Sequence, residues 1–182
     1  MENRIYNFNP GPAMQPLEVL QEAQAEFLNF AKSGMSIIEI SHRSKQYEQV
    51  HNQAKADIKE LMGLGDDYEV LFCQGGASMQ FTMIPQNFAV DGKVGNYVLS
   101  GSFATKAYDE AKLLNRGFVA ASSKDRDFKH IPTQDEIKLS DNAAYLHLCY
   151  NNTIYGTELH EDLDSLVGLK HFEAFYLSSH FL

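Results

Sequence analysis

The chain has 182 residues, of which 44% are hydrophobic and 21% are charged, and its formal net charge is -9. These proportions are typical of a globular domain and exclude a disordered or collagen-like chain. The acidic balance argues against a nucleic-acid-binding surface, which requires clustered Lys and Arg. Since no run is apolar enough to cross a bilayer or to form a signal peptide, we expect a cytoplasmic protein with small-molecule partners and no membrane contact.

Two amphipathic helices are expected in the first third of the chain. The first covers residues 16–30 and places four apolar side chains on one face: Leu20, Ala23, Phe27 and Phe30. A polar segment containing SHRSK separates it from the second helix. In the second helix, five side chains recur at helical spacing: Tyr47, Val50, Ala54, Ile58 and Leu61. Gly63 then supplies a carboxyl-terminal stop.

Four short apolar runs are typical of β-strands: YEVLFC, NYVLSG, GFVAA and AAYLHLC. Between them lie two helical stretches, SMQFTMIPQNF, which Pro85 should kink or end, and FATKAYDEAKLLN. The second stretch places four side chains on one face: Phe103, Ala107, Ala111 and Leu114. The alternation predicts an α/β fold with a mainly parallel sheet and helices on both faces. Cys73 and Cys149 each end an apolar run, so we expect buried, reduced thiols.

Three loops that follow predicted strands carry the residues of chemical interest, because ligands bind outside the carboxyl ends of parallel strands. The loop QGGAS combines two glycines, which let a ligand approach the backbone, with the amino end of a helix, which favours an anion. SGSF offers an aromatic ring, and YNNT offers a hydroxyl and two amides. The three loops could hold a flat, phosphorylated, heteroaromatic ligand.

Each loop also has a purely structural interpretation. The glycine pair could serve a tight turn, Phe103 could belong to the core, and Thr153 could be a simple cap. Nucleotide-binding alternatives fit worse, because the chain contains neither GxxxxGK[ST] nor GxGxxG.

Five phrases, in this order and at this spacing, resemble the N-terminal half of the phosphoserine aminotransferase family: NFNPGPAMQP, EISHRSKQY, VLFCQGGASMQF, SGSFATKAYDEAK and LSDNAAYLHLCYNNTIYGTE. The resemblance extends from about Tyr6 to Glu158. It implies a class V, pyridoxal-phosphate-dependent, homodimeric transaminase of the aspartate-aminotransferase fold (fold type I), with an incomplete large domain in this chain. The implied reaction moves an amino group between phosphoserine or glutamate and oxo acids such as 2-oxoglutarate, in serine biosynthesis and, in many bacteria, in vitamin B6 synthesis.

The resemblance also implies roles for individual residues of the three loops. The main chain at Ala77 and Ser78, with Gly76 beside them, is expected to bind the phosphate of pyridoxal phosphate. Phe103 corresponds to the aromatic residue that stacks on the pyridine ring, which is usually Trp, so the smaller ring should stack with less area. Thr153 corresponds to a hydroxyl that contacts the cofactor.

Arg43, with His42 beside it, corresponds to the residue that holds the acidic groups of the substrate, a task suited to the guanidinium fork. Its alternative interpretation is a surface charge. His51, His130 and His147 have no metal-ligand spacing, so we expect structural roles for them and no metal site.

The chain departs from the family pattern at two catalytic positions. The Schiff-base lysine of the family lies in an A-x-Q-K-N phrase, whereas the last lysine here, Lys170, lies in LVGLKHFEA. The family's D-[MF]-S-S phrase has its counterpart in YLSS, so Tyr176 stands where an Asp would hold the pyridine nitrogen protonated. We therefore expect no catalytic residue of the family in this chain.

The expected organisation is an N-terminal segment over residues 1–15, part of the cofactor-binding domain over residues 16–159, and a divergent tail over residues 160–182. A second hypothesis is a non-catalytic fragment or pseudogene product that only assembles with itself or with a complete subunit. A third, another enzyme of the same fold such as a cysteine desulfurase, is disfavoured by SHRSK.

Overall fold

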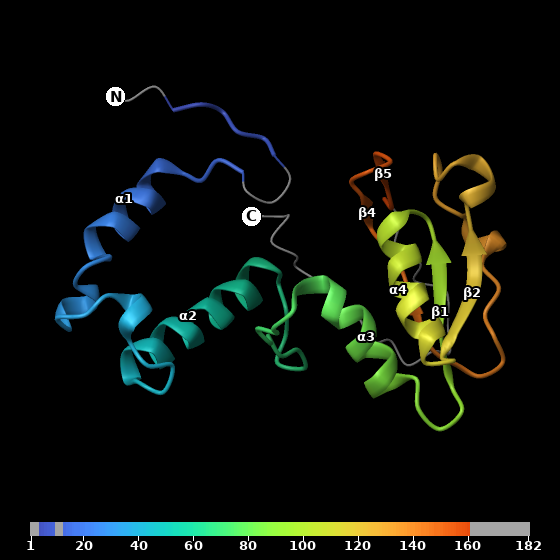
Figure 1. Ribbon diagram of the computed structural model, residues 1–182, viewed down its shortest axis with the longest axis horizontal. Coiled ribbons are helices and arrows are strands. Elements are labelled where there is room, and N and C mark those ends of the chain that lie inside the picture. The colour runs from blue at the N-terminus through green and yellow to red at the C-terminus, as the bar shows by residue number, and fades with distance from the viewer. Residues whose placement is uncertain (1–3, 10–12, 161–182) are drawn as a thin grey trace. The chain divides into compact units, whose positions relative to one another are not determined.

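The computed structural model describes residues 4–9 and 13–160, and they divide into two compact units (Figure 1). The first unit holds the described residues up to Cys73, and the second begins at Gln74. Lys170, Tyr176 and most of the predicted tail lie outside the described residues. No helix in the described part of the chain is long and apolar enough to cross a membrane.

The first helix of the first unit, α1, is shorter and more exposed than expected. It covers Leu17–Glu26 and buries no residue, and Phe30 lies in a separate 3₁₀ helix, Phe30–Lys32. The backbone of Asn29 leaves the helical region, with φ of -149°, so the helix cannot continue to Phe30. The predicted apolar face of α1 therefore has no core against which to pack within the described part of this unit.

The second helix, α2 (Lys45–Leu61), contains the five predicted side chains and ends before Gly63, as the sequence predicts. The Ser44 side chain accepts a hydrogen bond from the Tyr47 N–H at 3.2 Å and so satisfies one free donor of the first turn. Gly63 has φ of +64°. The Gly63 N–H donates to the Glu60 carbonyl at 3.1 Å and the Leu64 N–H to the Lys59 carbonyl at 2.9 Å, the two bonds of a glycine-terminated helix.

The predicted strand YEVLFC is wrong for this structure, because residues 68–73 belong to no strand among the described residues. The run lies against α2 instead. Lys55 pairs with Glu69, and the His51 and Phe72 rings meet edge to face at 5.1 Å. A strand exists only when a neighbour supplies its hydrogen bonds, and local pattern carries no information about that neighbour. Cys73 at the end of the run is exposed, so the expectation of a buried thiol there is also wrong.

The second unit contains a parallel sheet of three strands in the order β2-β1-β3. The strands are β1 (Val94–Leu99), β2 (Gly117–Ser122) and β3 (Ala143–His147). They confirm three of the four predicted strands and the parallel α/β architecture. Two helices accompany them, α3 (Gly76–Phe88) and α4 (Ser102–Leu113). Pro85 does not end α3, which continues to Phe88.

The helices α3 and α4 lie on one face of the sheet and bury its aromatic side chains. Ala107 and Ala111 of α4 are fully buried against Tyr97, which confirms the predicted face of this helix. The hydroxyls of Tyr97 and Tyr145 share a buried hydrogen bond of 2.5 Å. Burial and this bond hold the pKa of Tyr145 well above its usual value. The neutral pair satisfies two polar groups within an apolar layer.

The opposite face of the sheet is covered, within the described residues, by the segment that joins β2 to β3. Val98, Ala120 and Ala121 form this second core with Ile137. The segment carries two 3₁₀ helices, Lys124–Arg126 and Gln134–Glu136. A side-chain bond from the buried Asn96 to Ser140 at 3.0 Å fastens the segment to the sheet.

A small antiparallel hairpin follows β3 and lies near the end of the sheet to which β1 points (Figure 1). Its strands are β4 (Asn151–Asn152) and β5 (Thr157–Glu158). The turn between them closes where the Asn152 carbonyl accepts the Gly156 N–H at 2.8 Å, and Gly156 has φ of +69°. The loop YNNT therefore enters a defined hairpin at the carboxyl edge of the sheet.

Candidate functional site

The first turn of α3 presents free backbone donors, as the QGGAS phrase predicts. Gly75 is the N-cap and contributes no side-chain cap. The first hydrogen bond of the helix runs from the Met79 N–H to the Gly75 carbonyl at 3.3 Å. The N–H groups of Gly76, Ala77 and Ser78 precede that bond and have no acceptor within the helix. The first turn contains no acidic side chain, so its electrostatic field favours an anion.

The two glycines of the loop, Gly75 and Gly76, have different structural roles. Both have positive φ, +83° at Gly75 and +60° at Gly76. A Cβ on Gly75 would overlap the Met79 side chain, so this glycine permits the helix to pack on its own cap. A Cβ on Gly76 would meet no atom within 4 Å. The space above Gly76 is open to an approaching ligand, and a side chain there would fill it.

Phe103 is the second residue of α4 and is half-buried. The Lys106 Nζ lies 5.5 Å from the centre of the Phe103 ring, one turn further along the helix. This cation–π contact restrains both side chains. The ring stands at the amino end of α4, which directly follows the carboxyl end of β1.

Thr153 is exposed in the turn of the hairpin and is not a helix cap. The hairpin is joined to the start of α4, because Ser102 Oγ donates to the Tyr155 hydroxyl at 3.3 Å. Phe103 and Thr153 are thereby carried by two segments that touch.

The start of α3 is linked to the same edge of the sheet through its second turn. The Phe81 ring meets the His147 ring edge to face at 6.2 Å, and His147 is the last residue of β3. Further along, Thr82 Oγ1 donates to Glu110 Oε2 of α4 at 2.8 Å. Phe103 and Thr153 thus lie on touching segments at the carboxyl edge of the sheet, and Gly76 belongs to the same unit, at the amino end of α3.

His42 and Arg43 belong to the other unit, in the turn before α2. Both are exposed, and Arg43 forms no ion pair within residues 4–9 and 13–160. Arg43 is therefore available to bind an external anion. An ordinary surface charge would be exposed in the same way, so the structure fits both interpretations of Arg43.

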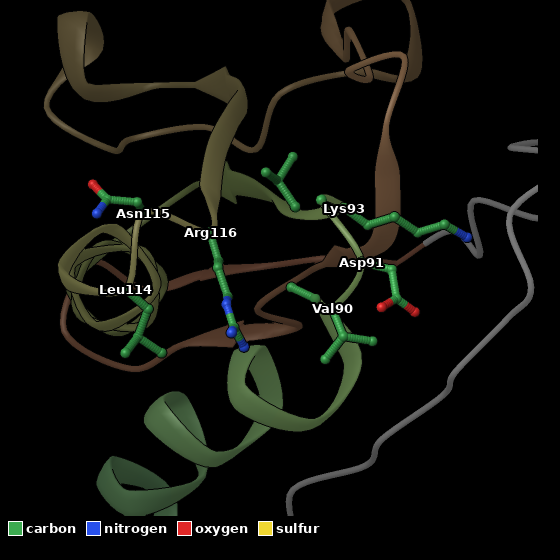
Figure 2. A pocket seen from close by; sticks show the side chains of 9 residues that line it. Val90, Asp91, Lys93, Leu114, Asn115 and Arg116 are labelled. Carbon is green, nitrogen blue, oxygen red and sulfur yellow. The ribbon is translucent and has the colours of Figure 1, made fainter.

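A hollow of about 200 Å³ lies at the opposite edge of the sheet, between the amino end of β1 and the carboxyl end of α4 (Figure 2). Lys93, Asp91 and Arg116 line it. Arg116 Nη1 donates to the Pro85 and Gln86 carbonyls at 3.1 and 3.2 Å, so this guanidinium serves the carboxyl end of α3. Since the hollow contains none of the predicted site residues, it is separate from the candidate site.

Burial favours the neutral form of two titratable groups at the end of β3, His147 and Cys149. His147 is buried, which lowers its pKa to about 4, and its ring stacks on Tyr97 at 5.2 Å. The Cys149 thiol is half-buried, and burial raises its pKa. No group of three or more metal-ligating side chains occurs in the described part of the chain. The site thus offers backbone donors, an aromatic ring and a hydroxyl.

A family model now decides the affiliation of the chain. The model described as aminotransferase class-V matches residues 5–177. The chain belongs to this family.

Relatives within the class-V aminotransferases define the affiliation more narrowly. The chain is 56% identical over 159 residues to a phosphoserine aminotransferase of Desulfosudis oleivorans, covering 87% of this chain and 44% of the relative. It is 50% identical over 166 residues to that of Geobacillus kaustophilus, covering 91% and 46%. The resemblance seen in the sequence is confirmed, and the chain spans less than half the length of these curated relatives.

Solved structures agree with the fold. A phosphoserine aminotransferase from Bacillus circulans subsp. alkalophilus matches with a TM-score of 0.84 and 53% identity, covering 89% of this chain and 45% of that one. The pyridoxal-phosphate-bound phosphoserine aminotransferase of Trichomonas vaginalis matches with a TM-score of 0.79 and 39% identity, covering 87% and 48%. The predicted fold type is confirmed, and the described units are part of that larger fold.

Two residues near the candidate site, Asn152 and Tyr155, were not predicted from the sequence. Asn152 is 3% exposed and lies inside the hairpin, and Tyr155 joins the hairpin to Ser102. The sequence offered only the phrase YNNTIYG, in which Gly156 could have indicated a turn before a return strand. The burial of Asn152 depends on a contact with residues about fifty positions earlier, which no local pattern reveals.

Proposed function

We propose that the chain carries the phosphate-binding and ring-binding parts of a phosphoserine aminotransferase, with pyridoxal 5'-phosphate as cofactor. The observation that carries the proposal is the first turn of α3, where the N–H groups of Gly76, Ala77 and Ser78 have no acceptor within the helix and a Cβ on Gly76 would meet no atom within 4 Å. Such a turn fits a phosphate monoester through hydrogen bonds and the helix dipole. The proposed substrates are phosphoserine, glutamate and 2-oxoglutarate.

The remaining residues of the proposed site have defined tasks. The N–H groups of Ala77 and Ser78 hold the phosphate, and Phe103 stacks on the ring. Thr153 donates or accepts a hydrogen bond at the ring edge through its hydroxyl. Pyridoxal phosphate, when bound, supplies the electron-accepting ring for amino-group transfer. Arg43, with His42, binds the acidic groups of the substrate through charge-assisted hydrogen bonds.

The proposed physiological setting is serine biosynthesis in the cytoplasm, with a further role in vitamin B6 synthesis. The relatives named phosphoserine aminotransferase support the first part. A homodimer is proposed as the assembled form.

Binding of pyridoxamine 5'-phosphate to the purified chain tests the proposal, with pyridoxamine as the ligand that lacks phosphate. The phosphate ester should bind at least about tenfold tighter, because each hydrogen bond to a charged group contributes roughly 1.5–3 kcal/mol. Gly76→Ala should remove the preference, since its Cβ would fill the open space.

A matched control is Gly92→Ala, at the opposite edge of the sheet. Gly92 has φ of +77° and, like Gly76, no atom within 4 Å of an added Cβ. Alanine at position 92 has a similar cost of adopting positive φ but no role in the proposed site. The Gly92→Ala variant should therefore still bind pyridoxamine 5'-phosphate more tightly than pyridoxamine. Equal binding of the two ligands by the unaltered chain would contradict the proposed phosphate cradle.

A second candidate function, assembly without catalysis, is favoured by the apolar surface of the first unit. Seven large side chains there are more than 70% exposed: Ile5, Tyr6, Phe8, Leu28, Ile38, Leu61 and Leu71. Exposed apolar surface of this extent marks an interface. Light scattering during size-exclusion chromatography should show a dimer or larger species. A monomer that stays soluble at high concentration would contradict the assembly role.

A further inference from the structure

We propose that Asn152 is a positioning residue, which fixes the Thr153-bearing hairpin against the loop that leads from β1 to Phe103. The contacts involve four residues, called here the Asn152 network: Ser100, Gly101, Asn152 and Thr157. Its effect on cofactor binding rests on the proposed function, whereas its effect on the hairpin does not.

The Asn152 side chain joins the hairpin to the end of β1. Its Nδ2 donates to Ser100 Oγ at 3.3 Å and to Thr157 Oγ1 at 3.1 Å. Ser100 is 1% exposed and Asn152 is 3% exposed, so the bond between them is shielded from water, and the bond to Thr157 is partly shielded. If the hairpin moved away from the end of β1, the buried amide would lose these partners without gaining water. That loss costs free energy, so this arrangement of the hairpin and β1 is favoured over others.

The Asn152 backbone also closes the turn that holds Thr153. Its carbonyl accepts the N–H groups of Tyr155 at 3.1 Å and Gly156 at 2.8 Å. The residue that closes the turn is therefore the residue that is anchored to β1. Any displacement of Asn152 moves Thr153, its neighbour in the chain.

Gly101 explains how the hairpin comes so close to α4. A Cβ on Gly101 would overlap Asn152 Oδ1. The φ of Gly101 is 177°, an extended value that any residue adopts, so the contact and not the backbone requires glycine here. The Gly101 carbonyl accepts the Thr105 N–H at 3.0 Å and Thr105 Oγ1 at 2.9 Å, which fixes the start of α4 and with it Phe103.

The network therefore sets the relative positions of Phe103 and Thr153. Gly101 precedes Phe103 by two positions, and Asn152 directly precedes Thr153. Asn152 Oδ1 is buried without a hydrogen-bond partner in the described residues, so it is held there by the other contacts and by shape. A ring bound between an aromatic face and a hydroxyl requires this spacing to be constant.

Hydrogen–deuterium exchange of the unliganded chain tests the structural part. Asn152→Ala should speed exchange in residues 149–159 by about tenfold, because two hydrogen bonds are lost. Thr157→Val keeps the shape of the side chain and removes one acceptor, so it should give a smaller increase in the same segment even if Asn152→Ala does not fold. Asn151→Ala, on the same hairpin outside the network, is the control. Unchanged exchange in Asn152→Ala or in Thr157→Val overturns the inference.

A pair of complementary variants tests the close approach. Gly101→Ala should speed exchange in residues 101–106, because the added methyl group forces Asn152 away. Combining it with Asn152→Ala removes the overlapping atom, so exchange in residues 101–106 should return toward that of the unaltered chain. Effects that simply add in the double variant would show that the two residues do not touch, and would overturn the inference.

Two ligands separate positioning from simple stabilisation. Asn152→Ala should lower the affinity for pyridoxamine 5'-phosphate and leave that for inorganic phosphate unchanged, since only the former needs Phe103 and Thr153 together. Equal losses for both ligands, or none, would reduce Asn152 to a structural residue and overturn the positioning role. If the unaltered chain binds neither ligand, the proposed function fails and the exchange results alone decide whether the network exists.

Discussion

A single imidazole, that of His147, couples the stability of the second unit to pH. Its ring lies between Tyr97 and Phe81, and its Nδ1 is buried without a partner in the described residues. Burial lowers its pKa from 6.5 to about 4. His147 is therefore protonated below about pH 6.5 in the unfolded chain, but only below about pH 4 in the folded chain.

We predict that His147 leaves the stability of the folded chain undiminished above pH 6.5, and that this stability is lost progressively as the pH falls toward 4. The loss amounts to about 3 kcal/mol when 1.36 kcal/mol is counted for each pKa unit. Between pH 7 and pH 4, urea unfolding should therefore show that the unaltered chain loses about 3 kcal/mol more stability than His147→Phe. Parallel curves for His147→Phe would contradict the buried, neutral state.

The two thiols should differ in reactivity. Cys73 is exposed, whereas Cys149 is half-buried and has a pKa raised by burial. Since the thiolate is the nucleophile, iodoacetamide at pH 8 should label Cys73 at least about tenfold faster. Peptide mass spectrometry checks the order, and Cys73→Ser should leave only the slow reaction. Preferential labelling of Cys149 would contradict the packing around the end of β3.

At the scale of elements, α3 offers a comparison of two neighbouring glycines. Gly75→Ala places a methyl group on the Met79 side chain in addition to adopting positive φ, whereas Gly76→Ala bears the φ cost alone. We expect a loss of about 1–2 kcal/mol in the free energy of unfolding for Gly76→Ala and a clearly larger loss for Gly75→Ala. Chemical denaturation measures both. A smaller loss for Gly75→Ala would mean that the cap does not pack on Met79.

A helix or strand could be predicted from the sequence where its residue pattern is clear and the segments that it contacts lie nearby in the chain. The helix α2 shows this, because Ser44 and Gly63 fix its ends and its spacing fixes its face. The strands β1, β2 and β3 were also predictable, since each supplies hydrogen bonds to another run of the same unit. Residues 68–73 have an equally apolar pattern and form no strand, because strand formation depends on a neighbour.

The candidate site likewise has features that could be predicted from the sequence and features that could not. The helix start at Gly76, Ala77 and Ser78, with its N–H groups that have no acceptor within the helix, could be predicted because a glycine loop and a helical pattern are both visible in one phrase. The anchoring of Thr153 through Asn152 could not, since it depends on Ser100 and Gly101, which lie far away in sequence.

At the scale of the whole molecule, we expect this polypeptide to be inactive by itself. Supplied with pyridoxal phosphate, phosphoserine and 2-oxoglutarate, it should form no glutamate above the background of the free cofactor. The chain has no lysine in an A-x-Q-K-N phrase, and proton transfer by a positioned group typically contributes ~100- to 10,000-fold. Stopped assays for glutamate, with a lysine-bearing full-length relative as control, measure this. Turnover that disappears in Lys106→Ala would assign the task to Lys106.

The strand order β2-β1-β3 has a consequence for how the second unit forms. β1, α4 and β2 are consecutive, and β2 pairs with β1 through a short crossover. β3 must reach the other side of β1, and the connecting chain of residues 123–142 closes the second face on its way. Because loop-closure entropy delays contacts between distant residues, the β1–α4–β2 part should form first on a folding pathway and β3 should dock last. During synthesis, the nascent chain would thus hold an incomplete two-stranded sheet until β3 emerges.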